Sequence, residues 1–330
     1  MKSSVIWGAF LGKRLPVALP DEPAIAIVGR MLRWRLILSV VFISVLVGLC
    51  WLDWHASRPG IFLLPLAIVA AALAAGELLA MFRKRGHEPL AWVVYGGVLL
   101  TVFAAAAPGL WPEAVALGTV QGVGWIALGL AIGLLIAFVG ELQRYDGGSG
   151  ATVRTALSAL SICYVGGLVG FLIQLRLIGG GDGRLGMLAL ISLIAIVKSS
   201  DIGQYTAGRM FGKHKLAPTV SPGKTWEGAA GGVLFAFFAA WLLMAYAAPA
   251  MLGGEIAATV SILRLAPFVF ALVAAGIVGD LAESLLKRDA GVKDSSTWMP
   301  GFGGVLDLID SLLGAAPVAF LFWAMRWVGP

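Results

Sequence analysis

Long apolar stretches, separated by short breaks rich in glycine, proline and charged residues, make up most of this sequence. Most of them approach the ~20 residues that a helix needs to cross a bilayer. The pattern therefore predicts nine transmembrane helices, of which the sixth is the shortest. Their expected ranges are 36–52, 61–82, 91–108, 119–140, 156–175, 185–197, 230–252, 265–283 and 304–327.

Composition favours the same fold class. The chain is 59% hydrophobic and 13% charged, whereas soluble domains carry roughly 25% charged residues. In hydrocarbon every backbone polar group must be bonded within the protein, which favours helices. We therefore predict an all-α polytopic membrane protein. Its two cysteines lie within apolar stretches and its three histidines are scattered, so neither a disulfide framework nor a Cys/His metal site is expected.

The distribution of positive charge predicts the orientation. With a cytoplasmic N-terminus, nine spans place all but five of the 24 Lys and Arg residues on the cytoplasmic side, in agreement with the positive-inside rule. Basic loops beside anionic headgroups then account for the net charge of +6, and no nucleic-acid partner is expected. The outer basic residues are Arg58, Arg176, Arg184, Arg264 and Arg326.

The predicted spans divide the chain into three parts. A cytoplasmic segment, 1–35, precedes a first set of transmembrane helices, 36–175, and a C-terminal transmembrane region, 176–330. Two polar segments, 198–229 and 284–303, interrupt that last region. Both are expected to be cytoplasmic loops.

The second polar segment and its flanks hold a dense set of charges. The spacing i, i+3, i+4, i+7 would place four polar residues on one helical face, namely Asp280, Glu283, Ser284 and Lys287. The next predicted helix carries Asp307 and Asp310 inside an apolar run, where charge is costly and usually functional. Pro300-Gly301 and Gly303-Gly304 break the chain before that helix and leave free backbone N–H groups that favour an anion.

These residue types together indicate a site for a metal ion and phosphates. The alternative is a solvated loop with ordinary capping charges. A further carboxylate, Glu77, lies deep in the second predicted span. It is either functional, as buried carboxylates usually are, or extended toward the nearby basic run 83–85.

The first polar segment is basic and rich in Ser, Thr and Gly. Its SPGKT run, residues 221–225, lacks the spacing of a Walker motif. Lysines and hydroxyl groups on a turn still suit a triphosphate. A basic loop docked on anionic headgroups is the alternative for Lys213, His214 and Lys215.

Both segments resemble the phosphatidate cytidylyltransferase family, also called CDP-diacylglycerol synthases. The family's C-terminal pattern is S-x-x-K-R-x4-K-D-x-G-x4-P-G-H-G-G-x-x-D-R-x-D. It is matched at Ser284, Lys287, Arg288, Lys293, Asp294, Pro300, Gly301, Gly303, Gly304, Asp307 and Asp310. Phe302 replaces the usual His, and Leu308 replaces the usual Arg.

The family's other conserved segment resembles residues 200–228 of this chain. The matched residues there include Ser200, Asp201, Gly203, Tyr205, Gly208, Arg209, Phe211, Gly212, Lys213, His214, Lys215, Leu216, Pro218, Ser221, Pro222, Lys224, Thr225, Glu227 and Gly228. The resemblance implies a multi-pass protein of a bacterial cytoplasmic membrane whose active site faces the cytoplasm. The implied reaction joins CTP and phosphatidate into CDP-diacylglycerol and pyrophosphate.

The resemblance also implies roles for individual residues. The expected catalytic residues are Lys287, Ser284, Asp307 and Asp310. The expected ligands of Mg²⁺, with K⁺ as an option for a second cation, are Asp280, Asp307 and Asp310. The expected substrate-binding residues are Asp201, Arg209, Ser221, Lys224, Thr225, Glu227, Arg288, Lys293, Gly303 and Gly304. Membrane lipids are further expected partners, and a homodimer is an open expectation.

Two other functions compete with this interpretation. Phe302 and Leu308 favour a non-catalytic, lipid-binding relative, although such a protein has little reason to keep carboxylates in apolar helices. A transporter would need a polar site near mid-membrane, whereas the charges here gather at one predicted face.

Overall fold

The computed structural model describes residues 24–113, 120–179, 182–253, 261–299 and 303–328, with side chains from residue 37 onward. Within these ranges nine helical stretches are long and apolar enough to span a membrane, which confirms the predicted fold class. The elements are α2 (Ala24–Trp54), α3 (Leu64–Lys84), α4 (Ala91–Leu110), α6 (Gly124–Arg144), α7 (Ala151–Ser161), η1 (Ile162–Gly167), α8 (Leu168–Arg176), α9 (Arg184–Phe211), β1 (Lys215–Ala217), β2 (Ser221–Thr225), α10 (Trp226–Leu242), η2 (Leu243–Ala247), α11 (Ala248–Leu252), α12 (Ile262–Asp289) and α13 (Val305–Ala324).

Two spans are composite. A π-helical turn, η1, joins α7 to α8, and a second one, η2, joins α10 to α11. Such turns are frequent at functional sites. The first of them carries Tyr164.

The two predicted loops are shorter than expected. The sixth span, α9, runs to Phe211, so the beginning of the segment 198–229 is helical, and the hairpin β1–β2 follows it. Likewise α12 continues to Asp289, into the segment 284–303. The prediction ended each span close to the charged residues, but polar residues continue a helix readily once it has left the hydrocarbon.

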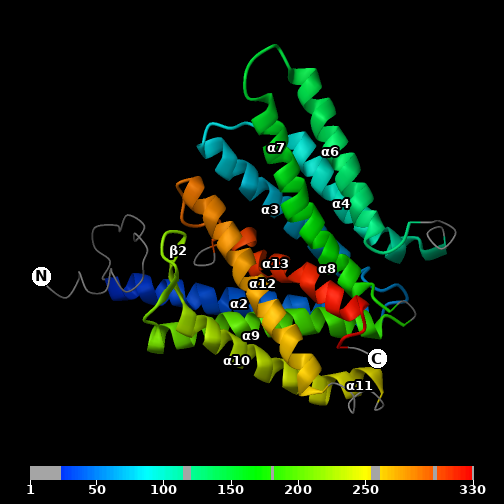
Figure 1. The fold of residues 1–330 in the computed structure, drawn as a ribbon, viewed down its shortest axis with the longest axis vertical. Coiled ribbons are helices and arrows are strands. Elements are labelled where there is room, and N and C mark those ends of the chain that lie inside the picture. The colour runs from blue at the N-terminus through cyan, green and yellow to red at the C-terminus, as the bar shows by residue number, and fades with distance from the viewer. Residues whose placement is uncertain (1–23, 114–119, 180–181, 254–260, 300–302, 329–330) are drawn as a thin grey trace, which may run out of the picture.

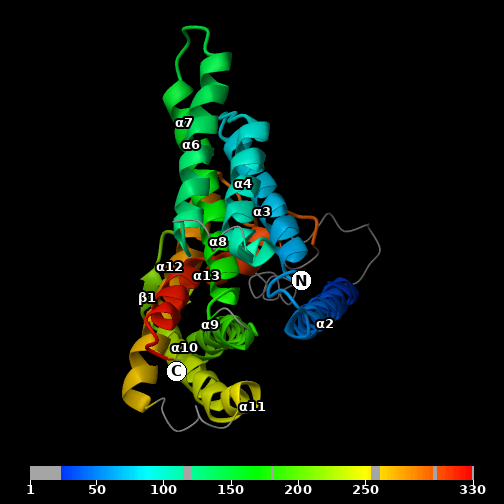
Figure 2. The same cartoon turned by 90° about the vertical axis from the view of Figure 1, so that its right-hand side faces the viewer.

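The helices form two groups that run in different directions. Figure 1 shows α3, α4, α6 and α7 rising together, while α2, α9, α10 and α11 lie across the lower part of the view. The turned view in Figure 2 keeps the same grouping. Helices α12 and α13 run between the two groups.

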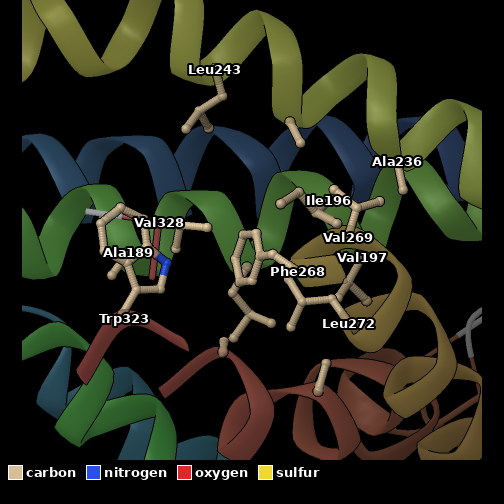
Figure 3. Packing of buried hydrophobic residues seen from close by; sticks show 14 of the residues in the cluster. Ala189, Ile196, Val197, Ala236, Leu243, Phe268, Val269, Leu272, Trp323 and Val328 are labelled. Atoms are coloured by element: carbon tan, nitrogen blue, oxygen red, sulfur yellow. The ribbon is translucent and has the colours of Figure 1, made fainter. Parts of the chain in front are cut away.

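Each group has its own hydrophobic core, and α13 belongs to both. Figure 3 shows Phe268 and Leu272 of α12 packed with Trp323 of α13 against α9. The Trp323 Nε1 donates to Ser192 Oγ at 3.1 Å. Farther toward its N-terminus, α13 packs Leu306 into the core formed with α3, α4 and η1. The first part of α13 is therefore held by the group with α3 and α4, and its last part by the group with α9.

Helices α12 and α13 cross at close range through small residues. A Cβ built on Gly279 would lie 2.5 Å from the Asp310 carbonyl oxygen and 2.9 Å from Gly314 Cα. Only glycine permits this approach of two backbones. The crossing sets Asp280, next to Gly279, beside Asp310.

A buried ion pair connects α2 to α8 at the end of the bundle that is predicted to face outward. Arg176 Nε lies 2.7 Å from Asp53 Oδ2, and both side chains are buried. The amides of Gly60 and Phe62 donate to the same carboxylate, each at 2.9 Å. Since every polar atom of such a pair needs a partner, these bonds make the buried charges tolerable.

Candidate functional site

The predicted polar face of α12 exists as the spacing indicated. Glu283, Ser284 and Lys287 are buried on it. Lys287 forms an ion pair with Glu283 one turn earlier, and Ser284 Oγ donates to Asp280 Oδ1 at 3.3 Å. Among the described residues Glu283 has no hydrogen-bond partner, so the ion pair with Lys287 is its main compensation.

Asp307 joins this face to the start of α13. Its Oδ1 accepts from Lys287 Nζ at 2.6 Å. Its Oδ2 accepts from the Ser295 amide at 2.8 Å, the Ser295 hydroxyl at 2.7 Å and the Gly304 amide at 2.9 Å. Both oxygens of Asp307 are therefore engaged with donors of the protein.

A second group of carboxylates lies one turn farther along α13. Asp310, only 6% exposed, accepts from Ser311 Oγ at 3.0 Å and lies close enough to Asp280 for the two charges to repel. Ser311 Oγ also lies 3.3 Å from Asp201 Oδ2 on α9. A lysine also belongs to this group, since Lys198 Nζ lies 3.3 Å from Asp201 Oδ2.

Two contacts bring the first predicted segment onto α12, the helix that leads into the second. Lys224 Nζ on strand β2 lies 2.9 Å from Asp280 Oδ2 on α12. Arg288 Nε also crosses from the second segment to the first, donating to the Val220 carbonyl at 3.1 Å. The site that the sequence divided between two distant segments is therefore contiguous in space.

The resulting cluster has more acids than bases. The carboxylates are Asp201, Asp280, Glu283, Asp307 and Asp310, and the ammonium groups are those of Lys198, Lys224 and Lys287. An excess of negative charge in a partly buried place attracts a cation. Tyr164 Oη is buried without a hydrogen-bond partner among the described residues, in the field of Asp280, Glu283 and Asp310.

The predicted trio of metal ligands is not assembled in this arrangement. Within the described ranges no three Asp, Glu, His or Cys side chains are grouped as a metal centre. Asp307 is turned to Lys287 and Ser295, whereas Asp280 and Asp310 lie close enough for their charges to repel. Mg²⁺ is often held by one or two carboxylates together with substrate phosphates and water. The pair Asp280–Asp310 therefore fits Mg²⁺, and Asp307 does not complete it.

Several predicted substrate-binding residues have other contacts. Thr225 Oγ1 caps α10 by accepting from the Gly228 amide at 3.1 Å. Glu227 Oε1 lies 2.6 Å from His214 Nδ1, which fastens the turn after α9. Arg209 donates to Tyr205 Oη at 2.6 Å. Ser221 pairs with Ala217 in the hairpin, and Lys293 is exposed in the loop after α12.

The expected anion site at Gly303 and Gly304 does not fit this structure. The Gly303 amide donates to the Met299 carbonyl at 3.2 Å, and the Gly304 amide donates to Asp307. The next two amides, of Val305 and Leu306, are bonded to the Glu77 carboxylate. A neighbouring helix therefore fills the position that the sequence left for a ligand. Pro300, Gly301 and Phe302 lie outside the described residues.

Sequence reasoning left Glu77 undecided and passed over Ser295. Glu77 does not extend toward the basic run 83–85 but accepts from the start of α13. The only sequence signal for Glu77 was its position deep in an apolar span. Ser295 gave no signal, because a serine in a polar loop is ordinary.

Comparison with known proteins places the chain in a family. The model of the cytidylyltransferase family matches residues 33–326. The phosphatidate cytidylyltransferase of Haemophilus influenzae is 44% identical over 138 residues, which are 42% of this chain and 46% of that protein. That of Pseudomonas aeruginosa is 44% identical over 142 residues, 43% of this chain and 49% of that protein.

These two matches span about half of each relative, but a third is nearly complete. The phosphatidate cytidylyltransferase of Brucella suis is 33% identical over 299 residues, which are 89% of this chain and 94% of that protein. The match includes the transmembrane helices before the two polar segments as well as the segments themselves. The chain therefore belongs to the cytidylyltransferase family.

Proposed function

We propose that this protein transfers the cytidylyl group of CTP to phosphatidate, giving CDP-diacylglycerol and pyrophosphate for phospholipid synthesis. The observation that carries the proposal is the pairing of Lys224 with Asp280 at 2.9 Å. It joins the first family segment to the helix that leads into the second, and so forms one cluster of carboxylates and lysines at a single end of the bundle. Membership of the family supplies the substrate class.

In the proposed reaction an oxygen of the lipid phosphate attacks the α-phosphorus of CTP. A new P–O bond forms, the bond from the α-phosphorus to the bridging oxygen of the β-phosphate breaks, and pyrophosphate leaves with that electron pair. The attacking phosphate is already anionic near neutral pH, so no covalent nucleophile on the protein is needed. Catalysis then consists mainly of positioning and of neutralising charge on the phosphates.

The lysines of the cluster supply the positive charge. Lys287 is held between Glu283 and Asp307, and so its ammonium group is fixed before the substrates arrive. Lys224 is held by Asp280 and faces the same cluster from the hairpin. Asp280 and Asp310 would hold Mg²⁺, which when bound neutralises phosphate oxygens and favours departure of the pyrophosphate. K⁺ remains our expectation for any second cation.

The proposed active site faces the cytoplasm, where CTP is available. The basic residues at this end of the helices agree with that orientation under the positive-inside rule. Phosphatidate would approach sideways from the membrane, with its phosphate at the cluster and its acyl chains among the lipids. We also expect a homodimer, which the mass of the detergent-solubilised protein would test.

The decisive experiment uses the purified protein in detergent with labelled CTP, phosphatidate and Mg²⁺. The expected result is a lipid-soluble cytidine product and one pyrophosphate released for each product molecule. Chelation of Mg²⁺ should stop the reaction, and added Mg²⁺ should restore it. Binding of phosphatidate without any product, at all Mg²⁺ concentrations, would instead establish the non-catalytic alternative that Phe302 and Leu308 favoured.

A further inference from the structure

Glu77 is a buried carboxylate from the first set of helices that contacts the start of α13. It is 7% exposed and lies on α3. Its Oε1 accepts from the Val305 amide and its Oε2 from the Leu306 amide, both at 2.9 Å. It also lies 2.8 Å from Ser295 Oγ and 3.3 Å from Trp298 Nε1. One side chain thus holds both the loop after α12 and the first turn of α13.

These bonds complete a helix start whose local cap is partial, because Asp307 accepts only from the Gly304 amide. The first amides of a helix have no partner within it, and the residue before α13 is Gly304, which has no side chain. Glu77 supplies the missing acceptors from α3, and its negative charge is favourable at the positive end of the helix dipole. In return the donors stabilise a carboxylate that burial would otherwise make costly.

Ser295 connects Glu77 to the reactive cluster. Its hydroxyl lies between Glu77 Oε2 and Asp307 Oδ2, at 2.8 and 2.7 Å. Asp307 in turn holds the Lys287 ammonium group. A displacement of Glu77 would therefore reach Lys287 through two intervening residues, Ser295 and Asp307, without any contact between Glu77 and the lysine.

We propose that Glu77 is a positioning residue for the transfer reaction: it fixes the first turn of α13 and the Ser295 loop, and so keeps Asp307 and Lys287 aligned. This inference rests on the proposed function. It assigns the first set of helices a part in the reaction beyond holding the protein in the membrane. Small misplacements of catalytic groups are sufficient to lower rates strongly.

The test compares Glu77→Gln with the wild-type protein in the cytidylyl-transfer assay. Glutamine keeps the size of the side chain but lacks the charge, and its amide nitrogen cannot accept a hydrogen bond. We expect kcat to fall about 100-fold, with KM for CTP changed less than about threefold, since Lys224 and the hairpin are untouched. Glu141→Gln is the matched control. Glu141 is equally buried, at 7% exposure, and is paired with Arg154 on α7, so its replacement should leave kcat near the wild-type value.

A double-mutant cycle separates positioning from stability alone. Ser295→Ala removes the connecting hydroxyl but leaves the Glu77 bonds to Val305 and Leu306. If Glu77 acts through Ser295, the two changes together should cost clearly less than the product of their separate effects. Independent, multiplicative effects on kcat would overturn the proposal, as would a wild-type kcat for folded Glu77→Gln. If Glu77→Gln does not fold, Ser295→Ala alone tests the proposal. A wild-type kcat for Ser295→Ala would show that the hydroxyl between Glu77 and Asp307 is not needed, and would overturn the proposal. Absence of product from the wild-type protein would count against the proposed function instead.

Discussion

At the scale of single residues, the sharpest question is which carboxylates would hold the Mg²⁺ that the proposed reaction needs. Asp310 is buried beside Asp280, whereas both Asp307 oxygens are bonded to donors of the protein. We expect Asp310→Asn to lower activity about 100-fold or more, and higher Mg²⁺ concentrations to recover part of it. Initial rates across a Mg²⁺ titration measure both effects. Asp182→Asn, an exposed acid paired with Arg184, is the control and should behave like the wild-type protein.

Asp307→Asn should lose activity for a different reason. The change removes the charge that holds Lys287 and leaves the Mg²⁺ pair in place. We therefore expect a comparable fall in rate that added Mg²⁺ does not relieve. The same titration measures it, and recovery of Asp307→Asn at high Mg²⁺ would return Asp307 to the ligand set that the sequence predicted.

The close packing around Gly304 gives this glycine a different role from the one that the sequence suggested. The sequence suggested a glycine with a free amide for an anion, but the space around Gly304 is filled by Ser295 Oγ and both Glu77 oxygens, which a Cβ would overlap. Gly304→Ala should therefore unfold at lower temperature and lose most activity. Gly96→Ala in α4 meets nothing within 4 Å and should retain stability and rate. Thermal unfolding of both variants in detergent would measure the difference.

The residue pattern predicted neighbours along a helix better than neighbours across the fold. The spacing of Asp280, Ser284 and Lys287 fixed their common face, because helical geometry relates nearby positions. The bond from the Val305 amide to Glu77 joins residues 228 positions apart. No local period encodes such a contact, so only the packing of α3 against α13 could show it.

At the scale of elements, hydrophobic length predicted the spans, and the hairpin was missed. Strands β1 and β2 are short and pair only with each other, so the segment 215–225 looked like a loop. The π-helical turns were missed as well, because a single wide turn leaves no mark in hydropathy. These unpredicted elements carry Lys224, which is paired with Asp280, and Tyr164, whose hydroxyl lies in the field of the acidic cluster.

The hairpin gives a matched pair of lysines for a prediction. Lys224 on β2 is bonded to Asp280, whereas Lys215 on β1 is exposed. We expect Lys224→Met to raise KM for CTP about tenfold or more, because one charged contact to phosphate is worth roughly 1.5–3 kcal/mol. Lys215→Met should change KM by less than about twofold, as exposed charges contribute little. Equal effects of the two changes, measured by steady-state kinetics, would show only a general attraction of the basic hairpin for CTP.

At the scale of the whole molecule, hydropathy predicted the number of spans but not how they are grouped. Nine stretches within the described ranges are long and apolar enough to span a membrane. The division into two inclined groups with α12 and α13 between them depends on close crossings such as Gly279 with Gly314. Composition shows that small residues are abundant, yet it does not show which of them meet.

The orientation of the molecule is a prediction that two exposed serines can test. Ser57 follows α2, and Ser149 lies between α6 and α7. The loop of Ser149 is at the same end as the family segments, because each span reverses direction. After replacement of Cys50 and Cys163, right-side-out membrane vesicles would be treated with an impermeant thiol reagent. Ser57→Cys should be labelled in sealed vesicles, and Ser149→Cys only after the vesicles are opened. The opposite pattern would place the acidic cluster outside and separate it from cytoplasmic CTP.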